Sequence, residues 1–173
     1  MSFIYHAVPR NMTGTVLYPL NELRNVSETV HATHARKYEG REHLTEERIP
    51  LLGNCLWGDV LFFIATPPAV FWQAYASVGF KKLRIQRHFQ FDVESLDQSK
   101  LAVLTKMGMN RPDVYEPFDL SRMDEYATLP QKTRDYWAEE LASGNTRPML
   151  YMHIPHILYR GSLDTLNTSV VET

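Results

Sequence analysis

The sequence lacks the features that mark secreted and membrane proteins. It contains a single cysteine, Cys55, so no disulfide can form within the chain, which suits a reducing compartment. No apolar run approaches the roughly 20 residues that a membrane-spanning helix needs. Residues 1–10 show no basic segment followed by an apolar run, the pattern of a signal peptide. We therefore expect a soluble, cytoplasmic protein that does not contact a membrane.

An excess of charge of one sign is also missing. The 18 Lys and Arg residues and the 20 Asp and Glu residues leave a formal net charge of −2. Such a chain has no overall field that attracts nucleic acid, so only a local basic patch would serve that purpose. The 173 residues, 44% hydrophobic and 22% charged, are typical of a globular protein. We expect one domain that spans residues 1–173.

Common catalytic and nucleotide-binding motifs are absent from the sequence as well. There is no G-x-G-x-x-G or P-loop, which argues against a doubly wound parallel sheet, and no G-x-S-x-G elbow of a hydrolase. Two histidine pairs, His31 with His34 and His153 with His156, would each supply only two zinc ligands. No C-x-x-C or H-E-x-x-H accompanies them, so we expect no metal site. We interpret Cys55 as a small buried apolar side chain.

Strand-like and helix-like segments alternate along the chain. Short aromatic and β-branched runs predict strands, and segments between a capping residue or proline and a glycine predict helices. The predicted strands are 3–8, 59–65, 88–93, 100–105 and 148–153, and the predicted helices are 27–39, 69–78 and 131–143. Residues 107–130 are interpreted as a loop or lid with at most short helices. Because strands outnumber helices and cluster late, the fold class is α+β, with a split, largely antiparallel sheet and flanking helices.

Two blocks in residues 1–70 carry a resemblance to a known family. The first holds Tyr5 and His6 on the first strand, followed by Asn11 and the segment 17–20. The second holds, in order, Arg48, Pro50, Gly53, Asp59, Val60, Phe62, Phe63 and Pro67. Both blocks resemble ADP-ribosyltransferase-like proteins, specifically the DarT-type DNA ADP-ribosyltransferases. The resemblance implies an ADP-ribosyltransferase-like fold that uses NAD as its substrate and transfers ADP-ribose to a nucleic-acid base or a protein.

The resemblance also implies roles for individual residues. The catalytic residues would be His6 and Arg48, and the NAD-binding residues would be Tyr5, Asn11, Arg48 and Trp57. Arginine suits the pyrophosphate because it pairs in a bidentate manner, and an indole ring stacks on a planar base. His6 and Asn11 would hydrogen-bond a ribose hydroxyl or the nicotinamide amide. We expect His6, Asn11 and Arg48 to line a single cleft; the alternative is that Arg48 pairs with a surface carboxylate and Trp57 packs under a loop.

The late part of the chain departs from the family pattern. DarT-like proteins carry a catalytic glutamate at the start of a late strand, whereas the matching segment here has Thr146, Arg147, Pro148 and Met149. A carboxylate stabilises the oxocarbenium-like centre that forms when the nicotinamide–ribose bond breaks. Two hypotheses therefore stay open: an NAD-dependent transferase, and a catalytically degenerate module that binds a nucleotide or a protein partner through the same cleft.

Overall fold

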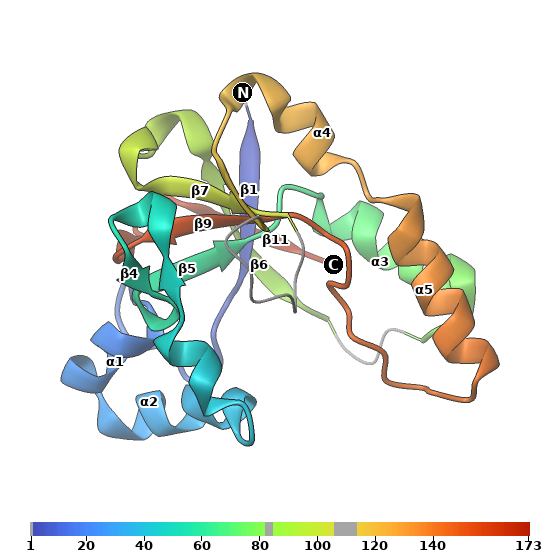
Figure 1. The fold of residues 1–173 in the computed structure, drawn as a ribbon, viewed down its shortest axis with the longest axis horizontal. Coiled ribbons are helices and arrows are strands. Elements are labelled where there is room, and N and C mark those ends of the chain that lie inside the picture. The colour runs from blue at the N-terminus through green and yellow to red at the C-terminus, as the bar shows by residue number, and fades with distance from the viewer. Residues whose placement is uncertain (1, 82–84, 106–113) are drawn as a thin grey trace.

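Two antiparallel sheets organise the chain (Figure 1). The computed structural model describes residues 2–81, 85–105 and 114–173. One sheet has the order β1-β6-β11 and the other the order β5-β9-β7-β8. The strands of the first are Phe3–Ala7, Arg87–Asp92 and Ser169–Glu172; those of the second are Val60–Phe63, His156–Arg160, Leu101–Leu104 and Tyr115–Pro117. All of their pairings are antiparallel, so the predicted α+β class with a split antiparallel sheet is confirmed.

The two sheets are tied together where β1 meets the end of β5. Tyr5 N donates to the Ile64 carbonyl at 2.8 Å, and Ile64 N donates to the Tyr5 carbonyl at 3.1 Å. Two short pairs extend the β-structure, β2 (Val16–Leu17) with β10 (Leu163–Asp164) and β3 (Arg48–Ile49) with β4 (Cys55–Leu56). The bridge at Tyr5 brings His6 beside β5, and this contact positions the candidate site.

Helices lie on two sides of the sheets (Figure 1). On one side α1 (Leu20–Val26) and α2 (Glu28–Ala35) follow each other, and the 3-10 turns η1 (Arg36–Tyr38) and η2 (Glu42–Glu46) continue toward β3. On the other side α3 (Pro68–Val78) packs against α5 (Gln131–Ala142), and α4 (Met123–Ala127) precedes α5. Pro68 begins α3, and Gly79 ends it with a φ of 115° that favours glycine.

Buried side chains fill the spaces between these layers. One cluster, with Ile4, Phe63 and Phe91, lies where the two sheets meet. A second cluster packs α3 against α5 through Phe71 and Trp137, whose ring centroids are 5.3 Å apart. A third lies under η3 (Pro50–Leu52) and η4 (Trp57–Asp59). The strand at 60–63 is apolar on both faces because each face meets one of these clusters.

Two sequence predictions need correction. Residues 148–149 have no regular structure and 150–153 form turns instead of a strand, and the strand begins at His156. His153 has a φ of 64° and Pro155 has no N–H to donate, so an extended ladder cannot start before His156. The predicted helix 27–39 is α2 followed by η1; Ser27 does cap it, since its Oγ accepts from Val30 N at 3.4 Å.

The structure describes only part of the lid predicted at residues 107–130. Residues 106–113 lie outside the described residues, and the remainder forms β8, the 3-10 turn η8 (Leu120–Arg122) and α4. None of the helices in the described ranges combines the length and the apolar character needed to cross a membrane. The cytoplasmic location stays a prediction.

Candidate ligand-binding cleft

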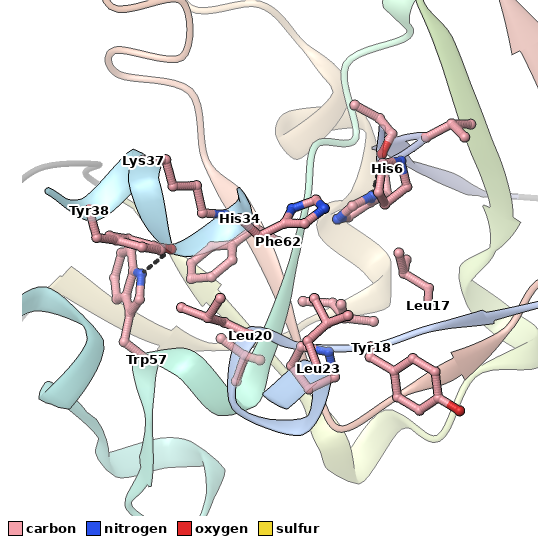
Figure 2. Close-up of a pocket in the computed structure, with 16 residues that line it drawn as sticks. His6, Leu17, Tyr18, Leu20, Leu23, His34, Lys37, Tyr38, Trp57 and Phe62 are labelled. Atoms are coloured by element: carbon pink, nitrogen blue, oxygen red, sulfur yellow. Dashed lines mark hydrogen bonds between the residues drawn. The ribbon is translucent and has the colours of Figure 1, made fainter. Parts of the chain in front are cut away.

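Two adjoining hollows open between β1, the α2–η1 segment and the start of β5. The first has a volume of about 250 Å³ and is drawn in Figure 2; the second, of about 440 Å³, extends toward β9. Both are lined by His6, Ala7, Lys37, Tyr38, Trp57 and Phe62, so we treat them as one cleft. Small-ligand sites commonly have volumes of about 300–1,000 Å³, and the second hollow alone falls in that range.

Aromatic rings form one wall of the cleft. Trp57 lies 4.6 Å from Phe62 between ring centroids, at an angle of 43°. Its Nε1 donates to the Tyr38 hydroxyl at 3.1 Å, the dashed line in Figure 2. Its backbone N donates to the Glu47 carbonyl at 2.7 Å. Because both ends of Trp57 are held, this wall is preorganised for a planar ring.

Two neutral imidazoles face the cleft. His6 Nδ1 lies 2.7 Å from the Ala7 carbonyl, and His156 Nδ1 lies 2.9 Å from the Ile154 carbonyl. Desolvation by the packed surroundings lowers the pKa of each ring to about 4. A carbonyl only accepts, so Nδ1 carries the proton in both rings and Nε2 keeps a lone pair. At neutral pH both histidines therefore offer a hydrogen-bond acceptor.

Cations reach the cleft from the segment after α2. Lys37 lines both hollows and Arg41 lines the second. Arg41 Nη2 donates to the Lys37 carbonyl at 3.0 Å, which fixes the guanidinium beside the turn at Gly40. Among the described residues that line the two hollows there is no Asp or Glu. The cleft thus combines aromatic walls with positive charge and suits an anionic ligand that carries a planar ring.

The structure brings together some of the residues expected from the sequence and separates others. Tyr5, His6 and Trp57 line the cleft. Arg48 and Asn11 do not line either hollow, so they do not join His6 in this cleft. Arg48 is exposed on β3 and its Nη1 donates to the Asn54 carbonyl at 3.0 Å. Asn11 is exposed in a tight turn, with a φ of 61°.

The alternative was that Arg48 pairs with a surface carboxylate and Trp57 packs under a loop, and the structure agrees with it only for part of Trp57. Arg48 contacts a backbone carbonyl of its own hairpin, because the two-residue strand β3 turns back at once through Gly53, and it forms no ion pair with a carboxylate of the described residues. Trp57 is 7% exposed and packs beneath the turn at Tyr38, yet part of its ring lines the cleft.

Sequence reasoning missed Lys37, Tyr38 and Arg41. The available signal was the run "RKYEGR" (36–41), which places three cations and an aromatic ring close to Gly40 after a helix. The late segment also contributes to the cleft, through Met149 and Tyr151. It adds apolar surface there, and no carboxylate.

Neither a cluster of metal ligands among the described residues nor a related protein indicates what the cleft binds. Among the described residues no group of three or more His, Cys, Asp or Glu side chains gathers in a way that would hold a metal ion. No protein-family model, curated protein or solved structure gave a significant match to the chain. The case for a function therefore rests on the geometry of the cleft.

Proposed function

We propose that the protein binds a nucleotide of the NAD class in this cleft, in the manner of an ADP-ribosyltransferase-like fold. One observation carries the proposal: the two hollows join a fixed aromatic wall at Trp57 and Phe62 to cations at Lys37 and Arg41, with no carboxylate among the lining residues in the described part of the chain. This combination matches a molecule with planar rings at its ends and negative charge between them.

Each part of the ligand has a complementary group. The phosphates lie toward Lys37 and Arg41, whose side chains donate charge-assisted hydrogen bonds. A base packs against the ring of Trp57 or Phe62. A ribose hydroxyl donates to Nε2 of the neutral His6.

The same composition argues for binding with little turnover. Cleavage of the nicotinamide–ribose bond is stabilised by a carboxylate near the developing positive charge, and the lining residues of the described chain offer none. In this reading the protein is the degenerate, nucleotide-binding form of the family.

One contact supports the transferase as a second candidate. Glu47 is joined to the cleft wall because its carbonyl accepts from Trp57 N. Burial raises the pKa of the Glu47 carboxyl, and its Oε1 is buried without a hydrogen-bond partner within the described residues. The carboxyl interacts with His43 and Tyr115, and in the transferase it would turn from there toward a ligand bound against Trp57. Transfer to a nucleic-acid base or a protein would then depend on Glu47.

Calorimetric titration with NAD tests the proposal. Lys37→Gln and Arg41→Gln are each expected to weaken binding about tenfold, the effect of one charge-assisted hydrogen bond. Lys132→Gln, an exposed lysine on α5, and Arg48→Ala are matched controls that leave the affinity unchanged. Absence of NAD binding in the unmodified protein, or equal losses in all four variants, would refute the proposal and favour a protein-binding module.

An assay of nicotinamide release separates binding from transfer. We expect binding without measurable release. Steady release that Glu47→Gln abolishes would establish the transferase instead.

A further inference from the structure

Within the described residues, one buried ring nitrogen of the first hollow has no hydrogen-bond partner. His34 Nε2 is inaccessible to solvent, and nothing in the described part of the chain donates to it or accepts from it. His34 lies on α2 and lines the first hollow together with His6 and Lys37. A buried polar atom without a partner is uncommon and often marks a place that another molecule fills.

Three nitrogen-bearing side chains from three elements converge on this point. Figure 2 shows the rings of His34 (α2) and His6 (β1) pointing toward one another across the hollow, with Lys37 (η1) beside them. Their electrostatic coupling agrees with this closeness, because Lys37 and His34 both act to lower the pKa of His6. Lys37 also acts to lower the pKa of His34, after desolvation by burial.

The titratable groups that act on these two rings are all basic. His6 faces Lys37, His88 of β6 and His34, and His34 faces Lys37 and His31. The residues that line the first hollow include no acidic side chain within the described chain. Lys37 gives the hollow a positive potential that attracts an anion, and no lining carboxylate in the described chain offsets it.

The two rings differ in how they can meet an anion. His6 Nδ1 donates to the Ala7 carbonyl, so the neutral His6 ring presents the lone pair of Nε2 to the hollow. His34 Nε2 has no partner among the described residues and donates to an anion once the ring is protonated. A lone pair repels an oxyanion. An oxyanion bound at this point therefore favours the protonated His34 ring, whose Nε2 donates a charge-assisted hydrogen bond to it.

We propose that His34 and Lys37, opposite the neutral His6, form a subsite for a phosphate-type oxyanion, which binds with uptake of a proton by the His34 ring. This subsite rests on the cleft being the ligand site proposed above and places one phosphate of that ligand in the first hollow. His34 takes the proton, since His6 has the more strongly lowered pKa.

The test uses sulfate as the probe, because sulfate carries no proton near neutral pH and any proton taken up must go to the protein. Calorimetry at pH 7 in two buffers of different ionisation enthalpy measures the number of protons taken up per sulfate. We expect a value near one. The affinity is expected to rise by up to tenfold for each unit that the pH falls between 8 and the pKa of free His34, since the bound state holds more protons there.

His34→Asn keeps a donor near the position of Nδ1 and removes Nε2. Proton uptake is expected to fall to near zero in this variant, and the affinity becomes independent of pH. The matched control is His31→Asn, one turn earlier on α2 and outside the lining of the hollow; it retains proton uptake. Retention of uptake in His34→Asn, or no saturable sulfate binding in the unmodified protein, overturns the subsite.

The outcomes separate this inference from the nucleotide proposal. If the Lys37 and Arg41 variants weaken NAD binding while His34→Asn leaves sulfate binding and proton uptake unchanged, the subsite is refuted and the proposed function stands. If sulfate binds through His34 while NAD does not bind, the subsite stands and the nucleotide proposal falls. A titration with inorganic phosphate against one with AMP then distinguishes a free anion from a nucleotide phosphate as the source.

Discussion

Protonation of His156 should destabilise the fold as the pH falls. The ring is 4% exposed, it packs against Tyr151 and Phe62, and burial lowers its pKa from 6.5 to about 4. The unfolded chain therefore binds more protons than the folded chain between these two pH values. The stability contributed by the neutral ring is complete above pH 6.5 and is lost as the pH falls toward 4.

The magnitude follows from the two pKa values. Each pKa unit corresponds to about 1.4 kcal/mol, so lowering the pH from 7.5 to 4.5 should reduce the free energy of unfolding by about 2–3 kcal/mol through His156 alone. His156→Asn keeps a donor for the Ile154 carbonyl and does not titrate. It loses packing at every pH, but it should be less sensitive to acid by that amount.

Urea unfolding followed by circular dichroism at both pH values measures the difference. His43→Asn is the matched control, since His43 is exposed on η2, and it should retain the full acid sensitivity of the unmodified chain. If His156→Asn loses as much stability between the two pH values as the unmodified protein, the ring is not held neutral in the fold and the reasoning fails.

Two further predictions concern the helical layer of α3 and α5. Thr133 is fully buried, and its Oγ1 donates to the Met152 carbonyl at 2.9 Å. Thr133→Val should therefore lower the free energy of unfolding by about 1–2 kcal/mol, measured by urea unfolding. An unchanged midpoint would show that water replaces the hydroxyl. Gly79→Ala should cost more than Gly144→Ala in thermal unfolding. Both glycines have positive φ, but a Cβ at Gly79 would lie 2.9 Å from Leu141 Cδ2 whereas one at Gly144 meets nothing within 4 Å; equal costs would mean that backbone strain alone decides.

Local patterns in the sequence were sufficient for much of the fold. The strand at 60–63 and the helix that begins at Pro68 and ends at Gly79 were predicted within a few residues, because burial on both faces, a proline start and a glycine stop act over short distances. The α+β class followed from the order of such segments. The prediction of a strand at 148–153 is wrong because Leu150 and Tyr151 pack on the α3–α5 layer. An apolar run alone does not distinguish a strand from a packed turn.

The membership of the cleft could be predicted only in part. Tyr5 and His6 lie on β1, and Trp57 lies just before β5. The two sequence blocks that resemble the family cover these two strands, so the predicted site included these three residues. Lys37 and Arg41 reach the cleft because α1 and α2 fold back past the end of β1. No local sequence pattern predicts this contact between segments. Arg48 lay in the matching motif, but its two-residue strand directs the side chain to the Asn54 carbonyl.

The sequence by itself determined the inventory of chemistry: aromatic rings, histidines, a near-balanced charge and no glutamate at the late position. Tertiary structure decided which of these groups meet. Among the described residues, it excluded carboxylates from the lining of the cleft and buried His34 Nε2 without a partner. It also held His6 and His156 neutral by desolvation. The physical reason is that burial and like-charge proximity depend on distances between segments far apart in the chain, and these distances exist only once the sheets and helices have packed.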